Sequence, residues 1–266
     1  MKRRITLVAT LAVLLAGCGG ELAEEAPSTA GAAPTTTLAV TSTAEGTTTS
    51  AAPTTSAAPT TVTVAAPETV EFPTADGLTL EGRLFPAGPV WVLLAHMYPA
   101  DMTSWFDFAA VLQEAGFTAL PYNNRGYGNS EGGQDFIDVG ADAQGAAAFA
   151  RSRGATTIFF FGASMNGAAA LFLAAEEDLA GIASLSGVPE WENTPGLQRA
   201  AEITEAALFV AAEDDDPSAE LARTMAGAVA GDSSLTIFPT GGHGTDMFRE
   251  NPELSQVLLD FVRAHA

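Results

Sequence analysis

The chain has 266 residues and a formal net charge of −21 at pH 7, from 11 basic and 32 acidic side chains. So acidic a protein argues against nucleic acid or an anionic membrane surface as its ligand. A single cysteine excludes an intrachain disulfide, and three histidines form no ligand cluster with it, so we expect neither a metal nor another cofactor.

The first 17 residues have the features of a secretory signal peptide. Residues 1–4 are basic (MKRR), and the apolar stretch at 5–16 is too short for a stable membrane span. The tetrad Leu-Ala-Gly-Cys at 15–18 resembles the lipobox of bacterial lipoproteins, where cleavage before the cysteine precedes lipidation of its sulfur. The resemblance implies lipidation of Cys18 and a secreted protein anchored by lipid at the outer face of a bacterial cell membrane. The alternative is an ordinary signal peptide followed by an incidental cysteine.

Residues 18–67 form a segment of threonine, alanine, proline and serine with repeated Ala-Pro-Thr-Thr units. It has almost no large apolar side chains, so it cannot bury enough area to offset the entropy of ordering. We expect a disordered tether that begins at the lipidated Cys18, with a composition typical of O-glycosylated stalks. The remaining residues, 68–266, are enough for one domain with a single core.

This domain alternates strand-like and helical segments. In chain order, the predicted elements are strands at 70–72 and 78–84 with a turn at 75–77, a strand at 90–95, a helix at 105–115, a strand at 117–122, a helix at 138–153, a strand from 157 that leads into an alanine-rich helix, strands at 182–186 and 207–212, a helix at 218–229, a strand at 234–238 and a helix at 251–264. The alternation predicts right-handed crossovers, and therefore an α/β fold with a mostly parallel central sheet and helices on both faces. Ligands of such sheets bind at the carboxyl ends of the strands.

The strand from 157 and the following helix meet at Gly162-Ala163-Ser164-Met165-Asn166. A serine on such a tight turn has its hydroxyl pushed out of the sheet, beside unpaired N–H groups of the helix. The segment resembles the nucleophile elbow of the α/β-hydrolase family, Gly-x-Ser-x-Gly, except that Asn166 replaces the second glycine and Gly167 follows it. The alternative is that Ser164 only caps the helix.

The resemblance extends over essentially all of 68–266. Residues 125–130 (RGYGNS) look like the Arg-Gly-x-Gly-x-Ser loop of the family. Only about 20 residues separate the strands at 182–186 and 207–212, where many relatives insert a cap domain, so no cap is expected. The compact form resembles the dienelactone-hydrolase-like and small esterase branches.

The family order of catalytic residues is serine, acid, histidine, and a serine hydroxyl needs such a base to become a good nucleophile. Of the three histidines, His265 lies at the end of the last helix, and His96 lies upstream of Ser164. His243 follows the last strand between glycines, where the family has its histidine, so the resemblance implies that His243 is the base.

The implied acid follows the strand at 207–212, where an acidic run begins. The family pattern points to Asp215, with Asp216 as the close alternative, and a neighbouring acid is expected to cap the helix that starts near Pro217. The acid would hold the histidine tautomer and stabilise the imidazolium.

An oxyanion hole needs two backbone N–H groups. The resemblance implies Met165, directly after the serine, and a residue of the loop after the strand at 90–95. By position that residue is Tyr98, with Met97 next, although the family carries glycine where this chain has Met97. Together with Met102 and Trp105, these side chains form either core packing or an apolar acyl-binding wall.

The leading hypothesis is a cell-surface serine hydrolase that cleaves a small-molecule or acyl ester through an acyl-enzyme. It is expected to act as a monomer and to contact the membrane only through its lipid anchor. Thioesterase, peptidase and polyester-hydrolase activities use the same residues and stay open. The alternative of a different class is a non-catalytic surface binding domain on a hydrolase fold.

Overall fold

A computed structural model of the protein describes residues 65–134 and 138–266. The predicted signal peptide (1–17), Cys18 and the predicted tether up to residue 64 therefore lie outside the described residues. In the described part, none of the helices is both long and apolar enough to cross a membrane.

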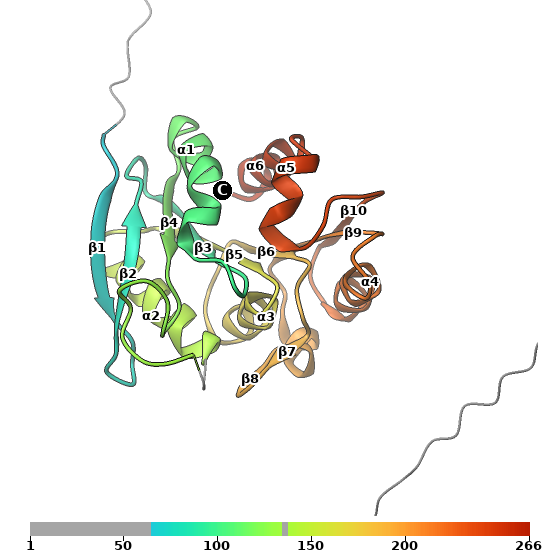
Figure 1. The fold of residues 1–266 in the computed structure, drawn as a ribbon, viewed down its shortest axis with the longest axis horizontal. Coiled ribbons are helices and arrows are strands. Elements are labelled where there is room, and N and C mark those ends of the chain that lie inside the picture. The colour runs from blue at the N-terminus through green and yellow to red at the C-terminus, as the bar shows by residue number, and fades with distance from the viewer. Residues whose placement is uncertain (1–64, 135–137) are drawn as a thin grey trace, which may run out of the picture. The chain divides into compact units, whose positions relative to one another are not determined.

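An eight-stranded sheet forms the centre of the domain (Figure 1). Its strands, in their order across the sheet, are β1 (Glu68–Pro73), β2 (Thr79–Leu84), β4 (Thr118–Tyr122), β3 (Val90–Ala95), β5 (Thr157–Ala163), β6 (Gly181–Leu185), β9 (Ala206–Ala212) and β10 (Ser233–Phe238). β2 pairs antiparallel with β1 and β4, and every pair from β4 to β10 is parallel. The predicted mostly parallel α/β sheet is confirmed.

The central strands are apolar because both faces of the sheet are covered. Every residue of β9 is buried, as is every residue of β5 after Thr157. β1 and β2, at one edge of the sheet, instead alternate between buried and more exposed residues. The two patterns explain why the sequence shows continuous apolar runs for the later strands and alternation for the first two.

Six α-helices cover the two faces of the sheet (Figure 1) in the described part of the chain. They are α1 (Phe106–Glu114), α2 (Val139–Ser152), α3 (Asn166–Glu176), α4 (Ser218–Ala228), α5 (Met247–Glu250) and α6 (Leu254–His265). Helices α2, α3 and α4 pack on one face, against side chains that include Phe160 and Phe209. Helices α1, α5 and α6 pack on the other face, against Phe159 and Phe161. Adjacent residues of β5 thus belong to different cores, as strand geometry requires.

Three local features differ from the predicted elements. A 3₁₀ turn, Met102–Trp105, precedes α1, and the side chain of Asp101 caps it by accepting a hydrogen bond from the Thr103 N–H. The last helix, α6, begins three residues later than predicted, because Asn251 adopts non-helical dihedral angles at the end of α5. The β6–β9 connection carries a two-stranded hairpin, β7 (Glu190–Trp191) and β8 (Thr194–Pro195), followed by the 3₁₀ turn Leu197–Glu202. This connection holds no cap domain, as predicted.

Candidate active site

Ser164 lies in the turn between β5 and α3 and adopts a φ of +52°. This left-handed conformation is unfavourable for a residue other than glycine, so the surroundings must hold it. The Ser164 N–H donates to the Leu185 carbonyl at 2.9 Å, and the Ser164 carbonyl accepts from the N–H groups of Gly167 and Val188 at 2.8 and 3.0 Å. The turn is therefore fixed at both of its peptide groups, and it presents the hydroxyl at the carboxyl edge of the sheet.

Close backbone contacts explain the two glycines of this turn. A Cβ on Gly162 would overlap the main-chain carbonyl of Asn166, and a Cβ on Gly167 would lie 2.5 Å from the Cα of Gly187. The side chain of Asn166 meets no such restriction and is fully buried. The elbow of this chain thus needs small residues at 162 and 167, whereas position 166 accommodates a polar side chain.

Ser164, His243 and Asp215 form one continuous hydrogen-bonded chain. The Ser164 Oγ lies 2.7 Å from His243 Nε2, and His243 Nδ1 lies 2.8 Å from Asp215 Oδ2. Because a carboxylate only accepts hydrogen bonds, we assign the ring proton to Nδ1, which leaves the Nε2 lone pair facing the serine hydroxyl. The side chains of His243 and Asp215 are 38% and 15% exposed. The arrangement can move a proton from the serine oxygen to the imidazole.

The loop after β10 brings His243 to the serine. Gly242 and Gly244, on either side of the histidine, have φ values of +72° and +57° that favour glycine. The Gly241 N–H donates to Asp214 Oδ1 at 3.1 Å. This contact ties the histidine loop to the acidic loop after β9, so the two loops that carry the ring and the carboxylate are joined next to the site.

The aspartates of the acidic run after β9 face in different directions. Asp215 faces the His243 ring, whereas Asp214 and Asp216 are exposed. Of the two aspartates that the sequence left open, only Asp215 contacts the histidine in the structure. The expected acidic cap of α4 is wrong, because Pro217 occupies the N-cap and no side chain caps this helix. The main-chain carbonyl of Asp215 accepts from the Ser218 N–H at 2.6 Å instead.

The two backbone N–H groups predicted for the oxyanion hole, those of Met165 and Tyr98, are unpaired among the described residues, and so is the alternative at Met97. Among the hydrogen bonds of residues 65–134 and 138–266, the N–H groups of Met165, Met97 and Tyr98 donate to no protein acceptor. Met165 begins the turn into α3, and Met97 and Tyr98 follow the carboxyl end of β3. The Met97 and Trp105 side chains pack in the core, whereas Tyr98 is 57% exposed. The apolar-wall interpretation therefore does not apply to the side chain of Trp105.

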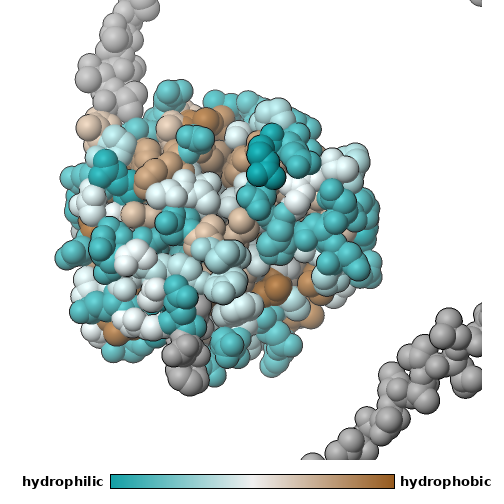
Figure 2. Space-filling model, in the orientation of Figure 1, coloured by the Kyte–Doolittle hydropathy of each residue, from teal (hydrophilic) through white to brown (hydrophobic). Residues whose placement is uncertain are grey.

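A depression of about 450 Å³ lies beside the site, between the start of α1 and the segment after His243. It is lined by Met97, Ala100, Ser104, Asp107, Thr245, Asp246, Phe248 and Arg249. Figure 2 shows a mostly hydrophilic face, with hydrophobic surface gathered where Figure 1 places α1. The depression offers space for part of a ligand next to the 96–98 loop.

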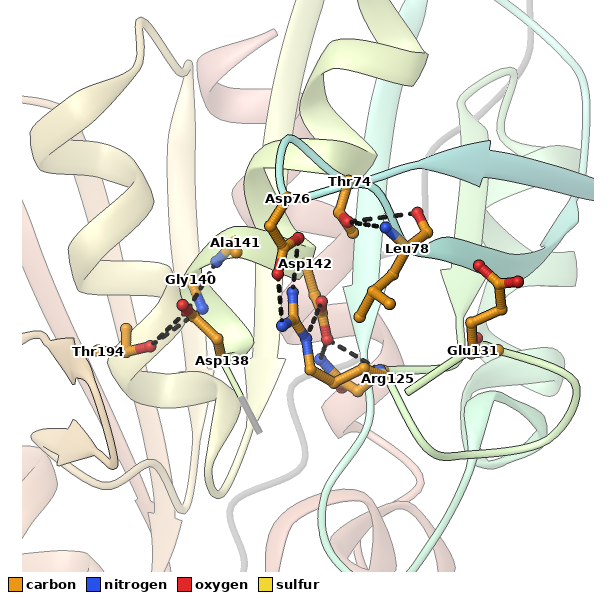
Figure 3. Close-up of polar contacts among 12 residues, drawn as sticks. Thr74, Asp76, Leu78, Arg125, Glu131, Asp138, Gly140, Ala141, Asp142 and Thr194 are labelled. Atoms are coloured by element: carbon orange, nitrogen blue, oxygen red, sulfur yellow. Dashed lines mark hydrogen bonds and ion pairs between the residues drawn. The ribbon is translucent and has the colours of Figure 1, made fainter. Parts of the chain in front are cut away.

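Arg125 begins the RGYGNS segment and lies between two aspartates (Figure 3). Its Nε is 2.8 Å from Asp142 Oδ1, and one of its terminal nitrogens is 2.8 Å from Asp76 Oδ2. The hydrogen bond from Arg125 lowers the pKa of the Asp76 carboxyl. Burial raises the pKa of Asp142, against the opposing effect of the Arg125 donors. This segment thus fastens the loop after β4 to α2, and it does not contact Ser164.

The structure also reveals polar residues that sequence analysis did not place near the site. Asn124, the second residue after β4, and Asp142, in α2, are both fully buried, and Asn124 Nδ2 donates to Asp142 Oδ2 at 3.2 Å. The only available signal was their proximity to the RGYGNS segment. In the part of the chain that the structure describes, no group of three or more His, Cys, Asp or Glu side chains is placed to hold a metal ion.

Comparison with known sequences yields distant relatives. No family model matches the chain. An uncharacterized protein of Mycobacterium tuberculosis is 27% identical over 219 residues, which cover 71% of this chain and 75% of that protein. The polyketide transferase grgF of Penicillium sp is 44% identical over 66 residues, which cover 24% of this chain and 22% of the transferase.

Comparison with solved structures gives matches over nearly whole domains. The α/β hydrolase GrgF from Penicillium sp. sh18 matches with a TM-score of 0.64 and 20% identity, over 76% of this chain and 99% of that chain. Dienelactone hydrolase from Anabaena variabilis matches with a TM-score of 0.63 and 19% identity, over 75% and 98%. An esterase from Pyrococcus furiosus matches with a TM-score of 0.62 and 15% identity, over 75% and 91%. The chain therefore has the α/β-hydrolase fold, in a compact form whose described residues include no cap domain.

Proposed function

We propose that the chain is a serine hydrolase that cleaves carboxylic esters through an acyl-enzyme. The observation that carries the proposal is the hydrogen-bonded order from Ser164 Oγ through the His243 ring to the Asp215 carboxylate, at 2.7 and 2.8 Å. A serine hydroxyl at the end of such a chain has an oriented base within reach of its proton.

In the proposed reaction, the Ser164 oxygen attacks the ester carbonyl carbon as its proton passes to His243 Nε2. The carbonyl electron pair moves onto oxygen, and the N–H groups of Met165 and Tyr98 stabilise the resulting oxyanion. The oxyanion then collapses, and the alcohol leaves with the proton from Nε2. A water molecule, deprotonated by His243, releases the acid and restores the serine. Asp215 holds the ring in the tautomer that accepts the serine proton.

The comparisons support the proposal at the level of fold, since an esterase and a dienelactone hydrolase share it. The segment shared with the polyketide transferase favours a second candidate, transfer of the acyl group to an acceptor other than water. Both candidates form the same acyl-enzyme at Ser164, and thioesterase and peptidase activities would do so as well. The released product tells the first two apart: a free acid indicates hydrolysis, and a new ester or amide indicates transfer.

Hydrolysis of a p-nitrophenyl ester series by the purified protein tests the proposal. Ser164→Ala and His243→Ala should each lower turnover at least about 10³-fold, and the double variant should be little worse, because the two residues act as one unit. Ser152→Ala, at the exposed end of α2, is the matched control and should retain full activity. If Ser164→Ala keeps full activity on every ester, the proposal is wrong and the turn around Ser164 serves only to cap the helix.

Labelling with a fluorophosphonate probe separates the enzyme from a non-catalytic binding domain. The proposal predicts covalent labelling of the wild-type protein at Ser164 and none in Ser164→Ala. An unlabelled and inactive wild-type protein would support the binding-domain alternative.

We also propose that the protein is secreted and held by lipid at Cys18 on the outer face of a bacterial membrane, with residues 18–67 as the tether. The support is the Leu-Ala-Gly-Cys tetrad at 15–18 behind a basic and apolar leader. Cys18→Ser should release the protein from the membrane fraction into the medium. Retention of this variant in the membrane fraction would contradict the lipoprotein assignment.

A further inference from the structure

Asn166 occupies the position where the elbow pattern has glycine, and its side chain joins three strands at their carboxyl ends. Its Nδ2 donates to the His96 carbonyl at 2.6 Å and to Asn124 Oδ1 at 2.8 Å. His96 directly follows β3, Asn124 lies just beyond β4, and Asn166 opens α3 directly after the turn that follows β5. Glycine at this position would make neither bond, so the departure from the family pattern creates a contact between the nucleophile turn and the loop at 96–98.

The direction of the Asn166 amide is determined by its partners. Asn124 Nδ2 donates to the Asp142 carboxylate, which can only accept, so Asn124 Oδ1 must face Asn166. The His96 carbonyl is also only an acceptor, so Asn166 must present its NH₂ group to both. Asp142 is in turn held by the Arg125 N–H and Nε, at 2.9 and 2.8 Å, the end of the network that Figure 3 shows. A buried ion pair thus orients the amide beside the elbow.

The loop at 96–98 is held from its other side by the His96 ring. His96 is fully buried, and its Nε2 accepts from the Asn124 N–H at 3.1 Å. The ring proton therefore lies on Nδ1, which donates to the Met97 carbonyl at 2.9 Å. Because each peptide group is planar and trans, holding the carbonyls of His96 and Met97 also orients the N–H groups of Met97 and Tyr98. The Tyr98 N–H is the loop donor proposed for the oxyanion, and the Met97 N–H is the alternative donor of the same loop.

The amide oxygen of Asn166 gives a second reason to assign this side chain a role at the loop at 96–98. Within the described residues, Asn166 Oδ1 is buried and accepts no hydrogen bond. An unpaired buried acceptor is unfavourable, and glycine, which the backbone of the turn would tolerate, would avoid it. The unpaired Asn166 Oδ1 therefore lowers the stability of the folded protein, whereas the two hydrogen bonds that Nδ2 donates help to hold the loop at 96–98.

We propose that Asn166 is a positioning residue that holds the loop at 96–98 in register with Ser164, so that a loop N–H points at the developing oxyanion. It performs this role in a loop that has Met97 in place of the family glycine. The inference rests on the proposed ester hydrolysis and adds to it the device that assembles the oxyanion hole from β3 and β5.

The test compares Asn166→Ala with Thr118→Val in the full-length protein. Thr118 lies at the opposite end of β4, and its hydroxyl donates to the Gly88 carbonyl and accepts from the Ala87 N–H, at 2.8 and 2.9 Å. Thr118→Val therefore removes two hydrogen bonds of a buried side chain far from the elbow. The measurements are kcat and KM for p-nitrophenyl acetate, the inhibition constant of an aryl trifluoromethyl ketone, and urea unfolding.

Asn166→Ala should lower kcat about 10- to 100-fold, less than the 10²- to 10³-fold typical of deleting an oxyanion donor, because the N–H groups remain but lose their alignment. KM should stay within about three-fold of wild type, since substrate binding does not need the oxyanion contact. The ketone, whose adduct with Ser164 carries an oxyanion, should bind more weakly by a factor close to the loss in kcat. Thr118→Val should lose stability and keep kcat and ketone affinity.

Asn166→Ala with wild-type kcat and ketone affinity, and only reduced stability like Thr118→Val, would overturn the positioning role. If Asn166→Ala does not unfold cooperatively, Asn166→Gly, which restores the family residue, carries the same measurements and the same two outcomes. A wild-type protein that neither hydrolyses esters nor labels with fluorophosphonate overturns the proposed function itself, and the positioning role with it. An active wild type with an unaffected Asn166 variant overturns the positioning role alone.

Discussion

Replacing Asp215 with asparagine should disable the His243 ring without changing the shape of the site. The Asp215 carboxylate accepts from His243 Nδ1 at 2.8 Å, and asparagine has nearly the same size. If the new NH₂ group faces the ring, the ring proton moves to Nε2 and points at the Ser164 oxygen, which then has no base. If the amide oxygen faces the ring, the tautomer survives, but no negative charge stabilises the imidazolium.

The size of the effect follows from the exposure of the pair. Where the acid of such a triad is buried, the same substitution lowers kcat about 10⁴-fold. Here the His243 side chain is 38% exposed and that of Asp215 15%, so water screens part of the carboxylate charge. We therefore expect a loss of about 10²- to 10³-fold, which corresponds to about 3–4 kcal/mol of activation free energy.

The assay is kcat/KM for a p-nitrophenyl ester at pH 7, with the neighbouring aspartates as matched controls. Asp216 is exposed, so Asp216→Asn should stay within about two- to three-fold of wild type. Asp214→Asn changes the acceptor of the Gly241 N–H and should have a small effect, because an amide oxygen can still accept. A large loss in Asp216→Asn with an active Asp215→Asn would refute the assignment of the acid and leave the serine and histidine assignments standing.

Two further predictions concern stability. Burial lowers the pKa of His96, so the unfolded chain binds a proton at a pH where the folded protein leaves the ring neutral. The free energy of unfolding should therefore fall as the pH drops below about 6.5, by at most about 1.4 kcal/mol per pH unit. Urea unfolding at pH 7.5 and 5.5 should show this component lost in His96→Gln and kept in the control His265→Gln; equal pH dependence in both would contradict it. Gly167→Ala should destabilise the protein by about 1–3 kcal/mol, because its Cβ would lie 2.5 Å from the Gly187 Cα. Gly227→Ala lies in α4, where no heavy atom comes within 4 Å of the added Cβ, and it should instead stabilise the protein by about 0.5–1 kcal/mol. Thermal melts in which the two variants shift the melting temperature in the same direction would refute the packing argument.

The sequence alone determined the class of the fold and the positions of the candidate site residues along the chain. Apolar runs such as 90–95 and 207–212 predict strands covered on both faces, because a strand in a parallel sheet has no solvent face to make polar. The turn around Ser164 follows from local backbone requirements, whereas the assignment of His243 rests on the resemblance to the α/β-hydrolase family. The predicted signal peptide, Cys18 and most of the tether rest on sequence alone and stay predictions.

Tertiary structure decided which side chains meet. Asp215 and Asp216 are neighbours in the chain, and only the path of the loop after β9 turns one toward His243 and the other toward solvent. The bonds of Asn166 span 70 residues to His96 and 42 to Asn124, and they exist because β3 lies between β4 and β5 in the sheet. Local sequence patterns carry no information on contacts of that range, which arise only when the strand order brings the carboxyl ends of separate strands to one edge.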